Sequence, residues 1–317
     1  MTIPLFTDDD VRQKLDMQTA IDVMQQAFER QAAGTLVAPP RLQADLEVGK
    51  LVFTTGADTA TPNCLGFRVY DVTQLHSPGR AELTAVFNTD DGALKGIVVG
   101  PLLGAVRTGA IGGVAMKWLS RPDARVLGIL GSGYQARTQL AAALSVRNFS
   151  EIRVYSRSEE HSTAFAEEAS KMTTAIVHPC PSACEVVESA DVLICATASG
   201  VPVFDPAWLR PGVHVNTIGP KFHSASELDG SVARKSQRLV TDSLAQAAAF
   251  GEDFILHGTD DFARLTSLSD IISSNEPVPR AAEEISLFYS LGLAGTEVLL
   301  ANRLIELAAT ADDLPSK

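Results

Sequence analysis

The segment Gly131-Ser132-Gly133-Tyr134-Gln135-Ala136 constrains the fold of this chain more than any other. It follows the apolar run Val126–Leu130, it opens a helical pattern over Tyr134–Val146, and a second apolar run, Ile152–Tyr155, comes next. Glycines mark turns in many proteins, but a strand, a glycine turn, a helix and a strand in succession are typical of a dinucleotide-binding unit. Gly131 permits the tight turn, Gly133 lets backbone amides approach a pyrophosphate, and Ala136 lets the helix pack closely. All six residues are therefore predicted to contact a cofactor.

Apolar runs continue to alternate with helical stretches after this unit. Strands are predicted at Val192–Cys195, at His214–Thr217 and at Leu239-Val240. Because buried parallel strands have continuous apolar runs, this alternation predicts a doubly wound parallel sheet of the Rossmann type. We assign four further residues to cofactor contacts: Thr108, Ala196, Thr197 and Gly219.

The second strand of the dinucleotide unit ends at Ser156-Arg157-Ser158, with no acidic residue among the three. An acid at this place accepts hydrogen bonds from the ribose hydroxyls of NAD and repels the 2′-phosphate of NADP. A guanidinium between two hydroxyls suits a phosphate instead. The sequence therefore predicts NADP as the preferred cofactor, with NAD as the alternative.

The first third of the chain has a different pattern. A single helix is predicted from Asp8 to about Gly34, and short strands are predicted at four places: Leu51–Phe53, Gly66–Tyr70, Ala85–Phe87 and Ile97–Val99. Asp90-Asp91-Gly92 supplies a hairpin turn between the last two strands, so this part is expected to form an antiparallel sheet. The tail from about Glu283 to Ala309 is predicted to be helical and to pack back on this first part.

Composition excludes several classes of protein. The chain has 317 residues, 45% of them hydrophobic, and a formal charge of -12, which argues against a nucleic-acid partner. Neither a signal peptide nor a long apolar span is apparent, so we expect a cytoplasmic protein with no membrane partner. Four scattered cysteines predict neither a disulfide framework nor a metal site.

Several motifs resemble those of the ornithine cyclodeaminase and mu-crystallin family, and the resemblance runs nearly end to end. They are Pro39-Pro40-Arg41, Arg107-Thr108-Gly109-Ala110, Lys117-Trp118-Leu119-Ser120-Arg121-Pro122, the Gly131 loop, Asn216-Thr217-Ile218-Gly219, and Ser290-Leu291-Gly292-Leu293-Ala294, which is similar to the family's C-terminal helix. The resemblance implies an α/β protein with a Rossmann domain, 121–287, inserted into an α+β domain, 1–120 plus 288–317. The second domain would bind the substrate and form a homodimer, with the active site in the cleft between the domains.

The family includes cyclodeaminases, alanine dehydrogenases and imine reductases, so individual residues have to select the reaction. Arg41 and Arg107 match the positions that hold the substrate's α-carboxylate. Where cyclodeaminases carry a catalytic lysine, this chain has Arg68, which stays protonated and suits anion binding better than proton transfer. Where they carry an aspartate, this chain has Lys221. Arg68 and Lys221 are expected to bind the remaining charge of the substrate. Alternatively, Lys221 or His223 delivers a proton to its nitrogen.

Three arginines and Lys221, with no matching carboxylate identified in the sequence, predict a cationic site for an anionic substrate. The leading hypothesis is an NAD(P)H-dependent reductase that makes an amino acid from an imino acid, either a cyclic ketimine carboxylate or a dicarboxylic imine such as iminosuccinate. Two alternatives stay open. One is ornithine cyclodeaminase, a lyase that forms proline and ammonia, and the other is a non-catalytic NADP- and ligand-binding protein like mu-crystallin.

Overall fold

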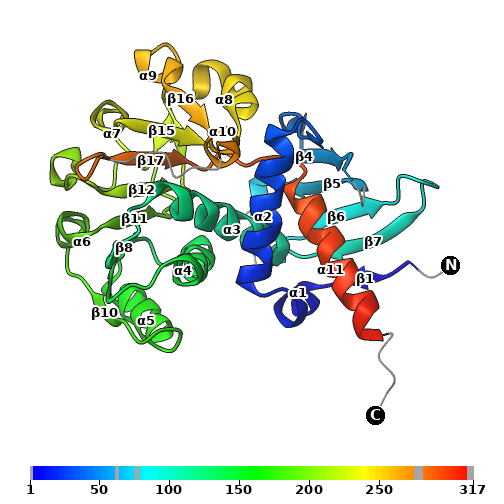
Figure 1. Ribbon diagram of the computed structural model, residues 1–317, viewed down its shortest axis with the longest axis horizontal. Helices are drawn as coiled ribbons and strands as arrows, with labels where there is room; N and C mark the ends of the chain where they lie inside the picture. Colours follow the sequence, from blue (N-terminus) through cyan, green and yellow to red (C-terminus); the bar gives the residue numbers. More distant parts are fainter. Residues whose placement is uncertain (1–2, 61–63, 75–76, 78, 275–280, 313–317) are drawn as a thin grey trace. The chain divides into compact units, whose positions relative to one another are not determined.

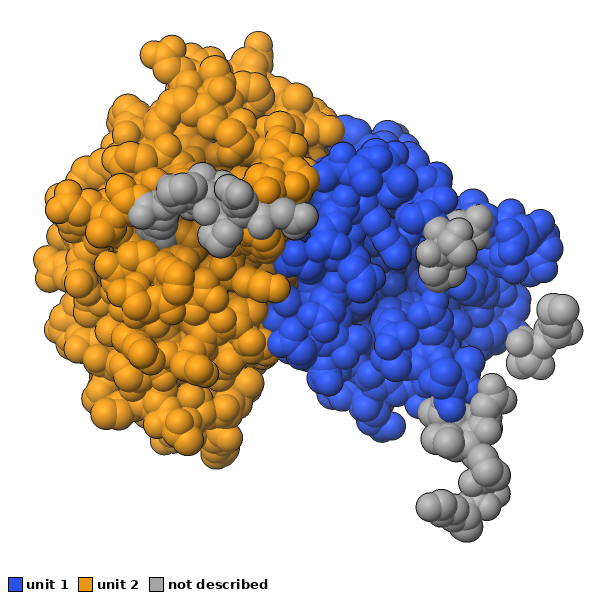
Figure 2. Space-filling view, in the orientation of Figure 1, with its two compact units in different colours: residues 1–107, 293–317 blue, residues 108–292 orange. Residues whose placement is uncertain are grey.

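The computed structural model describes residues 3–60, 64–74, 77, 79–274 and 281–312. The chain divides into two compact units, residues 1–107 with 293–317 and residues 108–292 (Figure 2). Helix α3 (Leu102–Leu119) crosses the division near its start. In the described part of the chain, no helix combines the length and the hydropathy that a membrane span requires.

The first unit is built on a mostly antiparallel sheet with the strand order β1-β7-β6-β5-β4-β2, and β3 pairs with β4. The strands are β1 (Leu5–Phe6), β2 (Leu36–Val37), β3 (Leu42–Leu46), β4 (Gly49–Asp58), β5 (Cys64–Asp71), β6 (Glu82–Phe87) and β7 (Leu94–Val99). The predicted hairpin between β6 and β7 is confirmed, with Gly92 at a φ of 72°. The antiparallel sheet expected from the sequence is thus present.

Helix α11 (Thr296–Asp312) lies across one face of this sheet, beside α2 (Met17–Ala32) (Figure 1). Small residues on the strands allow the close approach. A Cβ at Gly66 or Gly96 would crowd side chains of α11, and one at Gly56 would overlap the backbone of Gly295 just before the helix. Helix α11 therefore completes the core of the first unit, whose sheet comes from the first third of the chain.

The single helix predicted from Asp8 to Gly34 is wrong. The structure has α1 (Asp8–Lys14) and α2, separated at Leu15 and Asp16. The carboxylate of Asp16 accepts a hydrogen bond from the backbone of Thr19 at 2.6 Å, which caps the start of α2. The apolar periodicity continued through the break because the helices on both sides bury apolar residues.

The second unit contains an eight-stranded sheet with the order β10-β9-β8-β11-β12-β17-β15-β16, and every pair is parallel. Its strands are β8 (Val126–Leu130), β9 (Glu151–Tyr155), β10 (Ile176–Pro179), β11 (Val192–Cys195), β12 (His214–Thr217), β15 (Arg238–Thr241), β16 (Leu265–Ser267) and β17 (Ser286–Tyr289), and a small hairpin joins β13 (Lys221–Phe222) to β14 (Ala225–Ser226). Its shorter helices are α4 (Tyr134–Val146), α5 (Glu159–Ser170), α6 (Ala183–Ser189), α7 (Ser231–Lys235), α8 (Leu244–Phe250), α9 (Asp260–Ala263) and α10 (Leu268–Ser273).

Both faces of this parallel sheet are covered. On β11, Val192 and Ile194 belong to one buried apolar cluster, whereas Leu193 and Cys195 belong to another. Successive side chains of a strand point to opposite faces, so the two clusters lie on opposite sides of the sheet. The strand order reverses between β8 and β11, and in sheets of this kind ligands bind beyond the carboxyl ends of the strands at that point.

The predicted helix from Glu283 to Ala309 is wrong in its first half. Residues 286–289 form β17, a central strand of the parallel sheet, and α11 begins only at Thr296. The segment Ser290–Ala294, expected to be helical from the family resemblance, is the connection between the two, with Gly292 at a φ of 92°. A short buried apolar run fits a strand as well as a helix, which explains the error.

Candidate functional site

The glycine loop after β8 is packed against two neighbouring loops. Gly131 has a φ of 108° and its N–H donates to the carbonyl of Tyr155 at 2.9 Å, at the end of β9. A Cβ at this position would overlap the carbonyl oxygen of Ala196, which follows β11. Only glycine combines this backbone conformation with such close contact.

The residues of the loop fit a dinucleotide. Gly133 precedes the first turn of α4, no side chain caps that turn, and a Cβ built at Gly133 would have no other atom within 4 Å. An anion at this end of α4 would be attracted by the helix dipole and by the amides of its first turn. Arg137 supports this arrangement, because its Nη1 donates to the carbonyls of Ser132 at 2.8 Å and Gly133 at 3.2 Å.

The residues predicted to select the cofactor lie beside this loop. The hydroxyl of Ser132 is 3.1 Å from that of Ser156, at the end of β9. The side chain of Arg157 is exposed, and Ser158 caps α5 by accepting from the N–H of His161 at 3.3 Å. The structure thus brings the glycine loop and the Ser156-Arg157-Ser158 segment together.

A buried carboxylate that the sequence analysis missed connects two other predicted cofactor residues. Glu227 accepts hydrogen bonds from the backbone N–H of Thr197 at 2.9 Å and of Gly219 at 2.6 Å. These residues follow β11 and β12. Burial raises the pKa of Glu227, although its hydrogen bonds with Thr217 and Thr197 and the charge of Lys221 oppose the shift.

Lys221 and His223 lie in and next to the β13–β14 hairpin. Lys221 is buried, and its Nζ donates to the carbonyls of Ile218 at 3.2 Å and Ser290 at 2.8 Å. His223 is exposed, and its backbone N–H donates to the carbonyl of Asp253 at 2.9 Å. The backbone contacts of Lys221 link the connection after β12 to the connection after β17. A role for either side chain toward a substrate stays a prediction.

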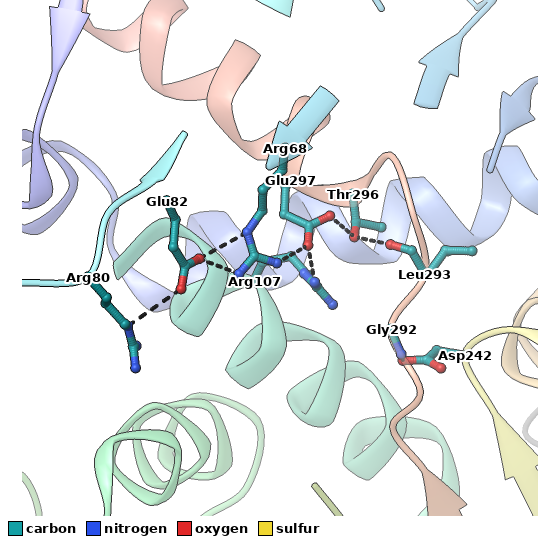
Figure 3. A network of polar contacts seen from close by, with 9 residues as sticks. All are labelled: Arg68, Arg80, Glu82, Arg107, Asp242, Gly292, Leu293, Thr296 and Glu297. Carbon is teal, nitrogen blue, oxygen red and sulfur yellow. Dashed lines mark hydrogen bonds and ion pairs between the residues drawn. The ribbon is translucent and has the colours of Figure 1, made fainter. Parts of the chain in front are cut away.

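In the first unit, two predicted arginines form a buried network with two glutamates (Figure 3). Arg68, on β5, donates from Nε to Glu82 at 3.0 Å and from Nη1 to Glu297 at 2.9 Å. Arg107, on α3, donates from Nη2 to the same oxygen of Glu297. We call Arg68, Arg107, Glu82 and Glu297 the ion-pair quartet.

The quartet corrects the expectation that the arginines have no matching carboxylate. Glu297 is 1% exposed, and its two arginine partners are 9% or less exposed. Burial by itself would raise the pKa of Glu297, but the charges of Arg107 and Arg68 outweigh this effect and lower it. Burial would lower the pKa of Arg68, whereas Glu297 and Glu82 raise it, so Arg68 keeps its proton. Within the quartet two positive charges face two negative charges, and Arg80, 3.6 Å from Glu82, adds a third cation beside it (Figure 3).

Two polar atoms beside the quartet have no hydrogen-bond partner among the described residues. They are Nε of Arg107 and Oγ1 of Thr54, both buried. Thr54 is the cross-strand partner of Arg68, so both side chains lie on the same face of the sheet. Arg41 lies between β2 and β3 and is partly buried. The sequence analysis did not predict Thr54, Glu82 or Glu297 as site residues, because no motif around them indicates that they lie beside Arg68 or Arg107.

The parallel sheet and its glycine loop are typical of dinucleotide-binding enzymes. The model of the ornithine cyclodeaminase/mu-crystallin family matches residues 4–311, and the chain belongs to this family. It is 32% identical over 228 residues to mouse ketimine reductase mu-crystallin, a match that covers 72% of this chain and 69% of the relative.

Solved structures agree with this assignment. The chain superposes with a TM-score of 0.87 and 29% identity on Thermococcus litoralis Δ1-pyrroline-2-carboxylate reductase in complex with NADH and L-proline, covering 98% of both chains. An archaeal alanine dehydrogenase dimer with bound NAD gives a TM-score of 0.85 at 26% identity, covering 98% of both chains. The predicted family and fold class are thus confirmed.

Proposed function

We propose that this NAD(P)H-dependent imino-acid reductase acts on a cyclic ketimine that carries one carboxylate, and that it makes the corresponding cyclic amino acid. The two buried carboxylates that pair with Arg68 and Arg107 are the observation that carries the proposal. A site of four uncompensated cations would favour a dicarboxylic substrate. Because Glu82 and Glu297 offset part of this positive charge, a substrate with a protonated imine and a single carboxylate suits the site better.

The residues of the quartet have separate roles in this proposal. Arg107 binds the substrate's carboxylate through its guanidinium, and Arg41 provides the second positive charge. Glu297 and Glu82 hold Arg68, and Glu297 also fixes the orientation of Arg107, so the carboxylate meets donors whose positions are already set. When bound, NAD(P)H supplies the hydride that reduces the C=N bond to an amine.

Arg68 argues against the cyclodeaminase alternative. A lysine can lose its proton and serve as a base or form a Schiff base, whereas Arg68 is held protonated by two buried carboxylates. Relatives with reductase names support the same choice: mouse mu-crystallin is named a ketimine reductase, and the Thermococcus enzyme a pyrroline-2-carboxylate reductase.

NADPH is the proposed preferred cofactor. Arg157 stands exposed at the end of β9 between two serines, where a 2′-phosphate of the adenosine ribose would lie. Its guanidinium would bind that phosphate through charge-assisted hydrogen bonds.

The test follows the oxidation of NADPH and NADH with a panel of imines. Pyrroline-2-carboxylate and piperideine-2-carboxylate are expected to be reduced, and both faster than oxaloacetate plus ammonium. A preference for the dicarboxylic imine would refute the charge argument. Release of proline and ammonia from ornithine without net cofactor reduction would establish the lyase, and cofactor binding without any turnover would support a binding protein.

We also propose that two copies of the chain form a homodimer through the sheet of the first unit. The face opposite α11 carries a group of apolar side chains that are only half buried: Phe53, Phe67, Val69, Leu83, Phe87 and Ile97. Leu42, Leu5 and Leu65 on the same face are 66%, 63% and 42% exposed. An exposed apolar sheet face of this extent is typical of a protein–protein interface. The archaeal alanine dehydrogenase structure is that of a dimer.

A further inference from the structure

We infer that Glu227 is a positioning residue for the cofactor, which fixes the loops after β11 and β12 relative to each other. The inference rests on the proposed use of a nicotinamide cofactor. It concerns a residue that does not need to touch the cofactor itself.

Five hydrogen bonds converge on this one carboxylate, whose residue is fully buried. Its Oε2 accepts from the N–H of Thr197 at 2.9 Å and from the hydroxyl of Thr197 at 2.8 Å. Its Oε1 accepts from the hydroxyl of Thr217 at 2.7 Å, the N–H of Ile218 at 3.1 Å and the N–H of Gly219 at 2.6 Å. Each oxygen therefore holds a different loop.

The two loops held by Glu227 are in direct contact with each other, and the loop after β11 also contacts the glycine loop. A Cβ at Gly219 would overlap the carbonyl of Thr197, just as one at Gly131 would overlap the carbonyl of Ala196. The loops after β8, β11 and β12 therefore form one continuous surface at the carboxyl edge of the sheet. Any shift of the Thr197 loop changes the surface on which a dinucleotide would lie.

The site requires a carboxylate rather than any polar group. Three of the five donors are backbone N–H groups, which cannot reverse their role to accept a hydrogen bond. In Glu227→Gln, the amide NH₂ would face either the N–H of Thr197 or those of Ile218 and Gly219. One loop would thus lose its anchor while the side chain keeps its shape and volume.

The experiment compares Glu227→Gln with Asp191→Asn. Asp191 is a matched control. It lies at the amino ends of the strands of the same sheet, and its carboxylate accepts hydrogen bonds from the backbone N–H of Arg125 at 2.8 Å and of Val126 at 2.9 Å. Dissociation constants for NADPH and NADH are measured by calorimetry on the whole chain, and thermal unfolding is recorded alongside.

Both variants are expected to unfold at lower temperature, but only Glu227→Gln should weaken binding of both dinucleotides, by about tenfold or more, because small misplacements of a preformed site are costly. Unchanged binding by Glu227→Gln, or equal weakening in both variants, would overturn the inference. If Glu227→Gln does not fold, Thr217→Val replaces it, because this variant removes one of the five hydrogen bonds to Glu227. Weaker dinucleotide binding by Thr217→Val would support the inference, and unchanged binding would overturn it. Failure of the wild-type chain to bind either dinucleotide would refute the proposed function itself.

Discussion

Nη1 of Arg68 lies 2.9 Å from Oε1 of Glu297, and Arg107 donates to that same oxygen. One buried carboxylate thus serves two buried cations that come from a strand and from a helix. Glu297 is supplied by α11, at the other end of the chain. The quartet therefore connects the C-terminal helix to the sheet by charge as well as by apolar packing.

Removing this carboxylate is expected to destabilise the first unit. Glu297→Gln leaves Arg68 and Arg107 with Glu82 as the one remaining carboxylate of the quartet, and breaking a buried pair costs about 3–5 kcal/mol. Urea unfolding measures the loss. Glu306→Gln is the control, because the contact of Glu306 with Arg303 is partly exposed to solvent and is expected to contribute at most about 1 kcal/mol. Equal losses in the two variants would contradict the importance of the quartet.

The same carboxylate predicts a pH dependence of stability. The pKa of Glu297 is lower in the folded chain than its ordinary value of 4.5, so the folded state binds fewer protons than the unfolded state between the two values. Its stabilising contribution is complete above the ordinary pKa and is lost as the pH falls through the folded pKa. Unfolding of the wild type followed from pH 6 downward should show this loss, and Glu297→Gln should lack that part of it.

The sequence predicted the dinucleotide unit well because its signals are local. The predicted bounds of β8, α4, β11 and β12 agree with the structure. Strands β8 and β11 are continuous apolar runs, whereas β12 is buried although three of its four residues are polar. The predicted tail helix failed at 286–289 because a buried strand and a buried helical turn share the same apolar composition there.

The ion-pair quartet could not be predicted in the same way. Arg68 and Glu297 are 229 positions apart, and only the packing of α11 on β5 brings them together. Arg68 was recognised because it departs from a family motif, whereas its partners Glu82 and Glu297 carry no local signal. The charge of the site was therefore overestimated until both carboxylates were placed.

The two glycines of the loop are expected to respond differently to alanine. Gly133→Ala should fold with little loss of stability, because its Cβ enters open space, but it should weaken dinucleotide binding by occupying the approach of the pyrophosphate. Gly131→Ala should lose stability as well, because its φ of 108° is strained for alanine and its Cβ meets Ala196. Calorimetric binding and thermal unfolding separate the two effects. Normal cofactor binding by Gly133→Ala would rule out the proposed place of the pyrophosphate.

Arg157→Ala tests the cofactor preference. Loss of the guanidinium should weaken NADPH binding by about tenfold or more and change NADH binding little, because only NADPH carries the 2′-phosphate. Arg153→Ala is a suitable control, since Arg153 lies on β9 just before this segment and pairs with Glu151 at 2.6 Å. An equal effect of Arg157→Ala on both cofactors would remove the basis for naming NADPH.

A charge on the open face of the first unit's sheet is expected to prevent dimer formation. Phe67 is half buried and its ring lies 6.3 Å from that of Phe87, so Phe67→Lys places an ammonium in the middle of the apolar surface. In a dimer that charge would be buried opposite its own symmetry copy without a partner, and its desolvation would oppose association. Light scattering should give a dimer for the wild type and a monomer for the variant. Ile176→Lys, at a 63% exposed position on β10 of the second unit, should leave the dimer intact. A wild type that stays monomeric, or a Phe67→Lys variant that still dimerises, would show that this face is not the interface.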